Sequence, residues 1–148
     1  MTKPTVALAA DHAGFELKNL LRDELKADGY TVVDLGTNGP ESVDYPDFGY
    51  SLARAVSHGQ AQFGIAVCGT GIGISIAANR LPTCRAALCH DASSARLSRE
   101  HNDANVLALG ARLIGVETAR DCVKTFLGTP FAGDRHTRRV TKLGQPAG

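Results

Sequence analysis

Residues 65–80 of this 148-residue chain read IAVCGTGIGISIAANR. An apolar run ends at Cys68, a turn with three glycines in five residues follows, and a second apolar segment leads away from it. This order predicts a buried strand, a tight turn and a helix. Peptide N–H groups in such a turn point outward, and a helix start adds partial positive charge. The place therefore suits an anion and favours a thiolate at Cys68.

Strand-like and helix-like segments alternate on both sides of this stretch. Short apolar runs predict strands at residues 5–9, 31–33, 63–68, 85–88 and 106–109. Apolar stripes and breaker residues predict helices at residues 15–26, 48 to about 59, 71–80, 92–100 and 116–127. The strands lack strict alternation, which is typical of strands buried on both faces. We therefore expect an α/β fold, with a five-stranded parallel sheet covered by helices on both faces.

Length and composition indicate one domain, residues 1–148, with a basic tail from about residue 134 to 148. That tail is expected to lie outside the core or to reach toward a partner subunit. The net charge is +1, so no global field attracts nucleic acid or anionic lipid. No apolar run approaches the ~20 residues of a membrane helix, and the N-terminus lacks the pattern of a signal peptide. We expect a cytoplasmic protein that binds neither nucleic acid nor membrane.

The other three cysteines are interpreted as ordinary core thiols. No Cys-x-x-Cys pair occurs, and a chain of this length folds without disulfides. Cys84, Cys89 and His90 match no common zinc spacing and lack a clear fourth ligand. A reducing compartment agrees with this use of cysteine.

The glycine turn departs from three common phosphate-binding loops. A dinucleotide fingerprint would need glycine where Ile74 stands, and it would follow the first strand. A Walker loop would need a Gly-Lys-Ser/Thr sequence, and a cysteine phosphatase loop would need arginine in place of Ile74. The glycines could instead only let strand and helix pack closely. Three glycines beside a cysteine at the end of a strand favour a functional site over packing alone.

Polar side chains follow every strand of the expected sheet. Ligands of open parallel sheets bind beyond the carboxyl ends of the strands. In chain order these positions hold Asp11 and His12, then Asp44, then residues 68–73, then His90 and Asp91, and finally Arg112. We expect this edge to gather acid, imidazole, thiol and guanidinium groups.

Some candidate residues also have plain structural interpretations. Asp11 could cap the helix that begins near Phe15, and His12 could be a capping or surface histidine. His101, taken alone, suits a solvated helix end. Arg135 and Arg139 are four residues apart and would share a helical face, where two guanidinium groups grip a phosphate well.

Five segments carry a family resemblance: ADHAGF (10–15), DYP (44–46), CGTGIGISIAAN (68–79), SREHNDANV (98–106) and GDRHTRRV (133–140). Together they resemble type B ribose-5-phosphate isomerase, in the family that includes the allose- and galactose-6-phosphate isomerases. The match runs in order from about residue 5 to residue 142. Position 75 is serine and position 68 is cysteine, so the chain resembles the cysteine-using branch.

The resemblance implies a Rossmann-like three-layer α/β/α sandwich with strand order 2-1-3-5-4. It implies a homodimer or tetramer with shared active sites, and neither metal nor cofactor. The implied reaction interconverts ribose 5-phosphate and ribulose 5-phosphate through a cis-enediolate, in the pentose phosphate pathway. The alternatives are a six-carbon sugar phosphate (allose 6-phosphate or galactose 6-phosphate) and a non-catalytic nucleotide-binding module.

The resemblance also implies residue roles. Cys68 would be the base, His101 would open the sugar ring as proton donor with Asp44 orienting it, and Thr70 would hydrogen-bond O1. The implied substrate-binding residues are Asp11, His12, Gly69, Thr70, Gly71, Ile72, Gly73, Asn102, Arg112, Arg135 and Arg139. Of these, His12 and the three arginines would hold the phosphate, with Arg135 and Arg139 from the other subunit. Asp11 and Asn102 would hold sugar hydroxyls.

Overall fold

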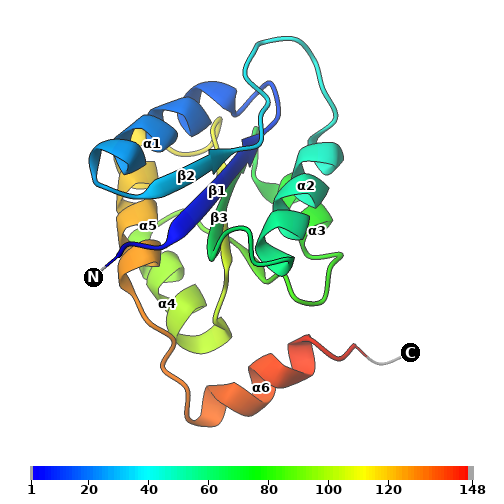
Figure 1. The fold of residues 1–148 in the computed structure, drawn as a ribbon, viewed down its shortest axis with the longest axis vertical. Coiled ribbons are helices and arrows are strands. Elements are labelled where there is room, and N and C mark those ends of the chain that lie inside the picture. The colour runs from blue at the N-terminus through cyan, green and yellow to red at the C-terminus, as the bar shows by residue number, and fades with distance from the viewer. Residues whose placement is uncertain (1, 147–148) are drawn as a thin grey trace.

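The computed structural model describes residues 2–146 and contains one sheet of five strands (Figure 1). The strands are β1 (Thr5–Ala10), β2 (Thr31–Asp34), β3 (Phe63–Cys68), β4 (Ala86–Leu88) and β5 (Val106–Gly110). All neighbouring strands pair in parallel, in the order β2-β1-β3-β5-β4. The predicted fold and strand order are confirmed.

Helices cover both faces of this sheet (Figure 1). One face carries α1 (Phe15–Ala27), α4 (Ala92–Asn102) and α5 (Val116–Gly128), and the other carries α2 (Tyr45–Ser57) and α3 (Ile72–Ala78). Helix α2 begins three residues earlier than its apolar stripe predicts, because Asp44 and Pro46 start it from the loop. Among the described residues, no helix is both long and apolar enough to cross a membrane.

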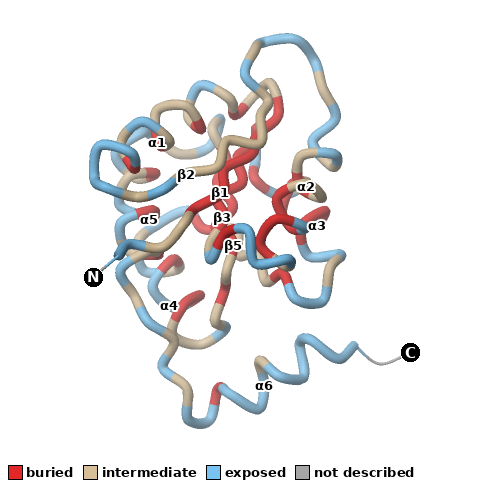
Figure 2. Tube along the Cα trace, viewed as in Figure 1, coloured by how far each residue is buried: buried red, intermediate tan, exposed pale blue. Residues whose placement is uncertain are grey.

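Strand β1 separates two apolar cores. Val6 and Leu8 face the core under α1, α4 and α5, whereas Ala7 and Ala9 face the core under α2 and α3. All four side chains are fully buried (Figure 2). This alternation is the period-two geometry of a strand with both faces covered. The small alanines on the second face let α2 and α3 lie close to the sheet.

Helix α6 (Arg135–Leu143) lies apart from both helical layers, beyond the end of α4 (Figure 1). Its only buried residue is His136, and most of the rest is exposed (Figure 2). The segment before it is held by a hydrogen bond from the Ala132 N–H to the carbonyl of Glu100, 3.1 Å long. The basic end of the chain is therefore a helix outside the two cores.

A fully buried lysine anchors the loop that follows β2. The Lys18 ammonium donates to Asp34 at 2.6 Å and to Asn38 at 2.7 Å, and Arg22 donates to the other Asp34 oxygen at 2.7 Å. Burial alone would raise the pKa of Asp34. Hydrogen bonds from Lys18, Arg22 and the Gly36 N–H outweigh it, so this pKa lies below its ordinary value. The network fixes the start of the loop that carries Asp44.

We expect Asp34→Ala to lower the free energy of unfolding by about 3–5 kcal/mol at pH 7, because it strips the buried Lys18 ammonium of its carboxylate. The pKa of Asp34 is lower in the folded than in the unfolded protein. Its stabilisation is therefore complete above the ordinary value of 3.8 and is lost as pH falls through the folded value. Denaturant unfolding of both proteins across this pH range measures the difference.

Asp23→Ala is the matched control, because that carboxylate also pairs with Arg22 but is 65% exposed. It should change the free energy of unfolding by less than about 1 kcal/mol. Equal losses for the two variants would contradict the role given to Lys18.

Candidate active site

Residues 68–73 turn sharply between the end of β3 and the start of α3. Gly71 has φ +78°, in the left-handed region. A Cβ there would lie 2.8 Å from the carbonyl carbon of Leu109 and 2.6 Å from the Leu88 side chain. Both facts require glycine. They also bring the turn directly against β5.

The sulfur of Cys68 accepts a hydrogen bond inside this turn. The donor is the Gly71 N–H, at an N–S distance of 3.1 Å. Cys68 is only 4% exposed, and its neighbours on the buried side are small or aliphatic. A donated N–H compensates negative charge on the atom that accepts it. The turn thus directs one backbone N–H at the Cys68 sulfur.

The three remaining cysteines have a different environment. Burial raises the pKa of the Cys84 and Cys122 thiols to about 11, and it also raises the pKa of Cys89. All three are free and buried. The prediction that they are core thiols is confirmed.

Asp11 occupies the loop between β1 and α1. Its Oδ1 accepts hydrogen bonds from the N–H groups of Ala13 at 3.0 Å and Gly14 at 3.1 Å, and the residue is 6% exposed. Asp11 therefore has the structural role that the sequence left open, at the entry to α1. Asp91, which follows β4, also has a structural role at a helix start, because it caps α4 by accepting a hydrogen bond from the Ser94 N–H. Oδ2 of Asp11 is left for a further partner.

His12 and Arg112 follow β1 and β5, the two strands that pair with β3. The Nδ1 atom of His12 accepts from the Val43 N–H at 3.2 Å, so a neutral ring carries its proton on Nε2, as a donor. The backbone of Arg112 donates to the Gly69 carbonyl at 2.9 Å, and its guanidinium lies over Gly69. The Nε2–H of a neutral His12 and the Arg112 guanidinium are thus two groups that can donate to an anion at this edge of the sheet.

The loop before α2 adds Asp44 and Tyr45 to the residues at the carboxyl ends of the strands. Asp44 is exposed just before α2, and its side chain makes no capping hydrogen bond. Tyr45 lies with its ring against Gly73, where a Cβ would come 2.6 Å from the ring carbon Cζ. The ring is 43% exposed. The sequence predicts no role for Tyr45, although the residue lies in the Asp-Tyr-Pro segment (44–46) that carries part of the family resemblance.

The other predicted residues gather around α6. His101, Asn102 and Arg139 line a cavity of about 300 Å³ with His136, and Arg135 precedes His136 on the same helix. The rings of His101 and His136 stack with centroids 4.4 Å apart. His136 was also missed from sequence, because ring stacking between two helices leaves no spacing signal.

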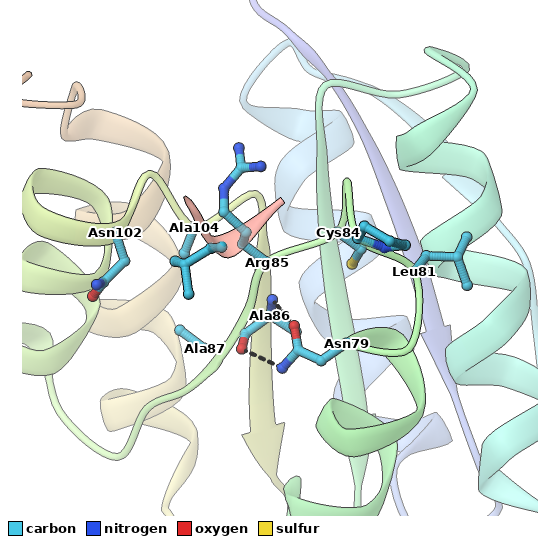
Figure 3. Close-up of a pocket in the computed structure, with 10 residues that line it drawn as sticks. Asn79, Leu81, Cys84, Arg85, Ala86, Ala87, Asn102 and Ala104 are labelled. Carbon is cyan, nitrogen blue, oxygen red and sulfur yellow. Dashed lines mark hydrogen bonds between the residues drawn. The ribbon is translucent and has the colours of Figure 1, made fainter. Parts of the chain in front are cut away.

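Asn102 also borders a neighbouring cavity of about 350 Å³ at the start of β4 (Figure 3). Opposite it, the side-chain amide of Asn79 pairs with both backbone groups of Ala86, at 2.7 and 2.9 Å. The amide thus continues the hydrogen-bond ladder at the free edge of the sheet. The two cavities place Asn102 at the amino ends of the strands.

The predicted site residues therefore form two groups at opposite edges of the sheet. The carboxyl-edge group comprises Asp11, His12, Asp44, residues 68–73 and Arg112, and the amino-edge group comprises His101, Asn102, Arg135 and Arg139. Cys68 pairs with Gly110 at the end of β5, whereas His101 precedes the first residue of β5, Val106. Five residues of strand span roughly 16 Å. One chain therefore does not bring together Cys68 and His101, which the sequence predicts to be the base and the ring-opening residue.

Comparison with known proteins agrees with this arrangement of motifs. Residues 6–143 match the Ribose/Galactose Isomerase family. The chain belongs to that family. Ribose-5-phosphate isomerase B of Escherichia coli is 46% identical over 138 residues, which are 93% of each chain. D-erythrulose-4-phosphate isomerase of Pectobacterium atrosepticum is 43% identical over 95% of this chain and 93% of its own.

A solved structure has the same fold. Ribose-5-phosphate isomerase B of Clostridium thermocellum superposes with a TM-score of 0.94, at 53% identity, and 95% of each chain is covered. The protein is therefore an isomerase enzyme of the sugar phosphate class, as its motifs predict. Within residues 2–146, no three His, Cys, Asp or Glu side chains gather as a metal site would require.

We expect Gly71→Ala to lower the free energy of unfolding by more than about 1 kcal/mol and to abolish turnover, since its Cβ forces the turn away from β5. Gly115→Ala is the control. Gly115 has φ −79°, and a Cβ there meets nothing within 4 Å. Denaturant unfolding and an isomerase assay of both variants test the expectation, and an active Gly71→Ala enzyme would refute it.

Proposed function

We propose that this isomerase interconverts ribose 5-phosphate and ribulose 5-phosphate, as a cytoplasmic enzyme of the pentose phosphate pathway. The observation that carries the proposal is the hydrogen bond of 3.1 Å from the Gly71 N–H to the Cys68 sulfur. It lies in a turn whose N–H groups can donate hydrogen bonds to an anion. The relatives named ribose-5-phosphate isomerase B, at 46% and 53% identity, support this substrate.

Proton transfer between carbons is the task of Cys68 in this proposal. The thiolate removes the proton from C2 of the open aldose, and the C–H electron pair forms a C1–C2 double bond. Negative charge then develops on the C1 oxygen, giving a cis-enediolate. Within residues 69–73, the Gly71 and Ile72 N–H groups donate to the Cys68 sulfur and the Thr70 hydroxyl, and the other N–H groups bind this charge where it forms. One such donor is typically worth about 100- to 1000-fold in rate.

Return of the proton completes the reaction. Cys68 delivers it to C1, while the C2 hydroxyl loses its proton and becomes the ketone. Thr70 hydrogen-bonds the C1 oxygen, and its exposed hydroxyl passes the proton from the C2 oxygen to the C1 oxygen. Atoms and charge balance with neither metal nor cofactor.

Ring opening and substrate holding fall to the remaining residues. His101, oriented by Asp44, moves a proton at the ring oxygen, because a histidine can give and take protons near neutral pH. The phosphate is held by Nε2 of His12 and by Arg112 from the carboxyl-edge group, and by Arg135 and Arg139 from the amino-edge group. Asp11 and Asn102 bind hydroxyls. Remote binding of this kind fixes the reactive geometry.

Each active site in this proposal takes its two groups from two copies of the chain. Cys68 and His101 are a strand's length apart in one copy, so a two-fold partner must supply the missing group. The surface of α3 carries two large exposed apolar side chains one turn apart, Ile72 (48%) and Ile76 (51%). They offer a contact for the partner, toward which α6, the described helix of the basic tail, reaches from the single domain; residues 147 and 148 of that tail lie outside the described residues.

A substrate panel tests the reaction. Protein dialysed against a chelator should isomerise ribose 5-phosphate with a larger kcat/KM than allose 6-phosphate or galactose 6-phosphate. Cys68→Ala should lose at least about 100-fold in kcat while keeping its fold, because it removes the base. Cys84→Ala, at a core thiol, should keep its kcat. A preference for a six-carbon sugar would shift the assignment to that substrate, and an active Cys68→Ala enzyme would remove Cys68 from the base role.

Mixing two inactive variants tests the shared site. Cys68→Ala and His101→Asn subunits, unfolded together and refolded at equal amounts, should regain about a quarter of the wild-type activity, because half of the dimers carry one intact site. Cys68→Ala mixed with Arg112→Ala is the control, since both changes affect the same group. That mixture should stay inactive, because no dimer in it carries an intact site. Activity in it would assign Arg112 to the other group. Activity no greater than the sum of the first pair's residual rates would contradict a shared site.

A further inference from the structure

His136 and His101 form an unusually ordered pair of rings at the junction of α4 and α6. Their centroids are 4.4 Å apart, and their planes differ by 17°. His136 is 7% exposed and is the only buried residue of α6. Although α6 otherwise lies outside the cores, this stack joins the helix to the domain through a side-chain contact with α4.

The charges around the pair are mostly positive. Arg135 and Arg139 flank His136 on α6, with Asp134 just before them, and His101 faces it from α4. Burial lowers the pKa of His136, and Arg135, His101 and Arg139 lower it further, while Asp134 acts in the opposite direction. Elsewhere on α4, Arg96 and Glu100 pair with each other at 2.7 Å. His136 is therefore neutral near neutral pH.

From this geometry we infer that His136 is a positioning residue for His101, holding the ring that opens the sugar in one plane by face-to-face stacking. The inference rests on the ring-opening role proposed above for His101. It adds a part to α6, which carries the two phosphate arginines and also holds the ring-opening histidine of α4 in place.

The stack suits a histidine that changes charge during the reaction. A neutral aromatic face accepts either a neutral ring or a cation above it, whereas two charged rings would repel each other. His101 can thus gain and lose its proton without leaving its place, since His136 stays neutral. Errors of about 1 Å in the placement of a reacting group cost on the order of 100-fold in rate.

Two substrates distinguish a His136 that positions His101 from a His136 that only stabilises the fold. Ribose 5-phosphate closes a ring through its O4 hydroxyl, whereas in erythrose 4-phosphate O4 carries the phosphate and no five-membered ring can close. His136→Gln should lose about 10- to 100-fold in kcat with ribose 5-phosphate, with KM within about threefold, and should change little with erythrose 4-phosphate. His136→Phe keeps a flat face and should recover most of the loss.

Arg138→Ala, at an exposed neighbour on α6, is the control and should match the wild type on both substrates. Equal losses on the two substrates in His136→Gln would make His136 a folding residue only and overturn the inference. Unchanged kcat with ribose 5-phosphate would overturn it as well.

A spectroscopic arm tests the stack independently of the proposed reaction. In the wild type and in His136→Phe, the neighbouring ring should shift the proton resonances of His101 upfield, and in His136→Gln they should move toward those of an unstacked histidine. His101→Asn identifies the signals. Unmoved His101 resonances in His136→Gln would overturn the stack, whereas a wild type that turns over neither sugar phosphate would instead contradict the proposed function.

Discussion

The hydrogen bond from the Gly71 N–H to the Cys68 sulfur is the interaction on which the rest of the site depends. It exists because Gly71 takes a left-handed conformation and lies against the backbone of Leu109 in the next strand. The same turn directs α3 across the sheet and sets Arg112 over Gly69. One backbone conformation thus places the sulfur, its donor and an arginine together, and it depends on the packing of β3 against β5.

The predicted site residues lie at two opposite edges of the sheet, and the direction of α4 explains why. This helix begins at the carboxyl edge, where Asp91 caps it, and ends at the amino edge with His101 and Asn102. A parallel sheet requires each helix to run back across it, so residues before a strand and residues after a strand lie at opposite edges. The proposed pairing of two copies follows from this geometry and not from surface composition.

Loops on the carboxyl side are held by buried polar contacts. Lys18 and Asp34 fix the start of the loop after β2, and the Val43 N–H bonded to His12 fixes its end. Between them the loop crosses the sheet edge and delivers Asp44 and Tyr45 to the start of α2. A loop held at both ends keeps its polar side chains oriented without burying them. At the amino edge, the stacked rings of His101 and His136 hold α6 against α4.

The sequence alone determined the fold class, the strands and the glycine turn that follows Cys68. Period and turn signals are local, and the spacing of glycines beside a strand-end cysteine is a local pattern as well. It also identified His101 and Arg139 through the family resemblance. Only the tertiary structure decided that these residues lie a strand's length from Cys68, that Asp11 serves the entry to α1, and that His136 stacks on His101. The reason is that such contacts join residues distant in the chain, and their geometry depends on how whole elements pack.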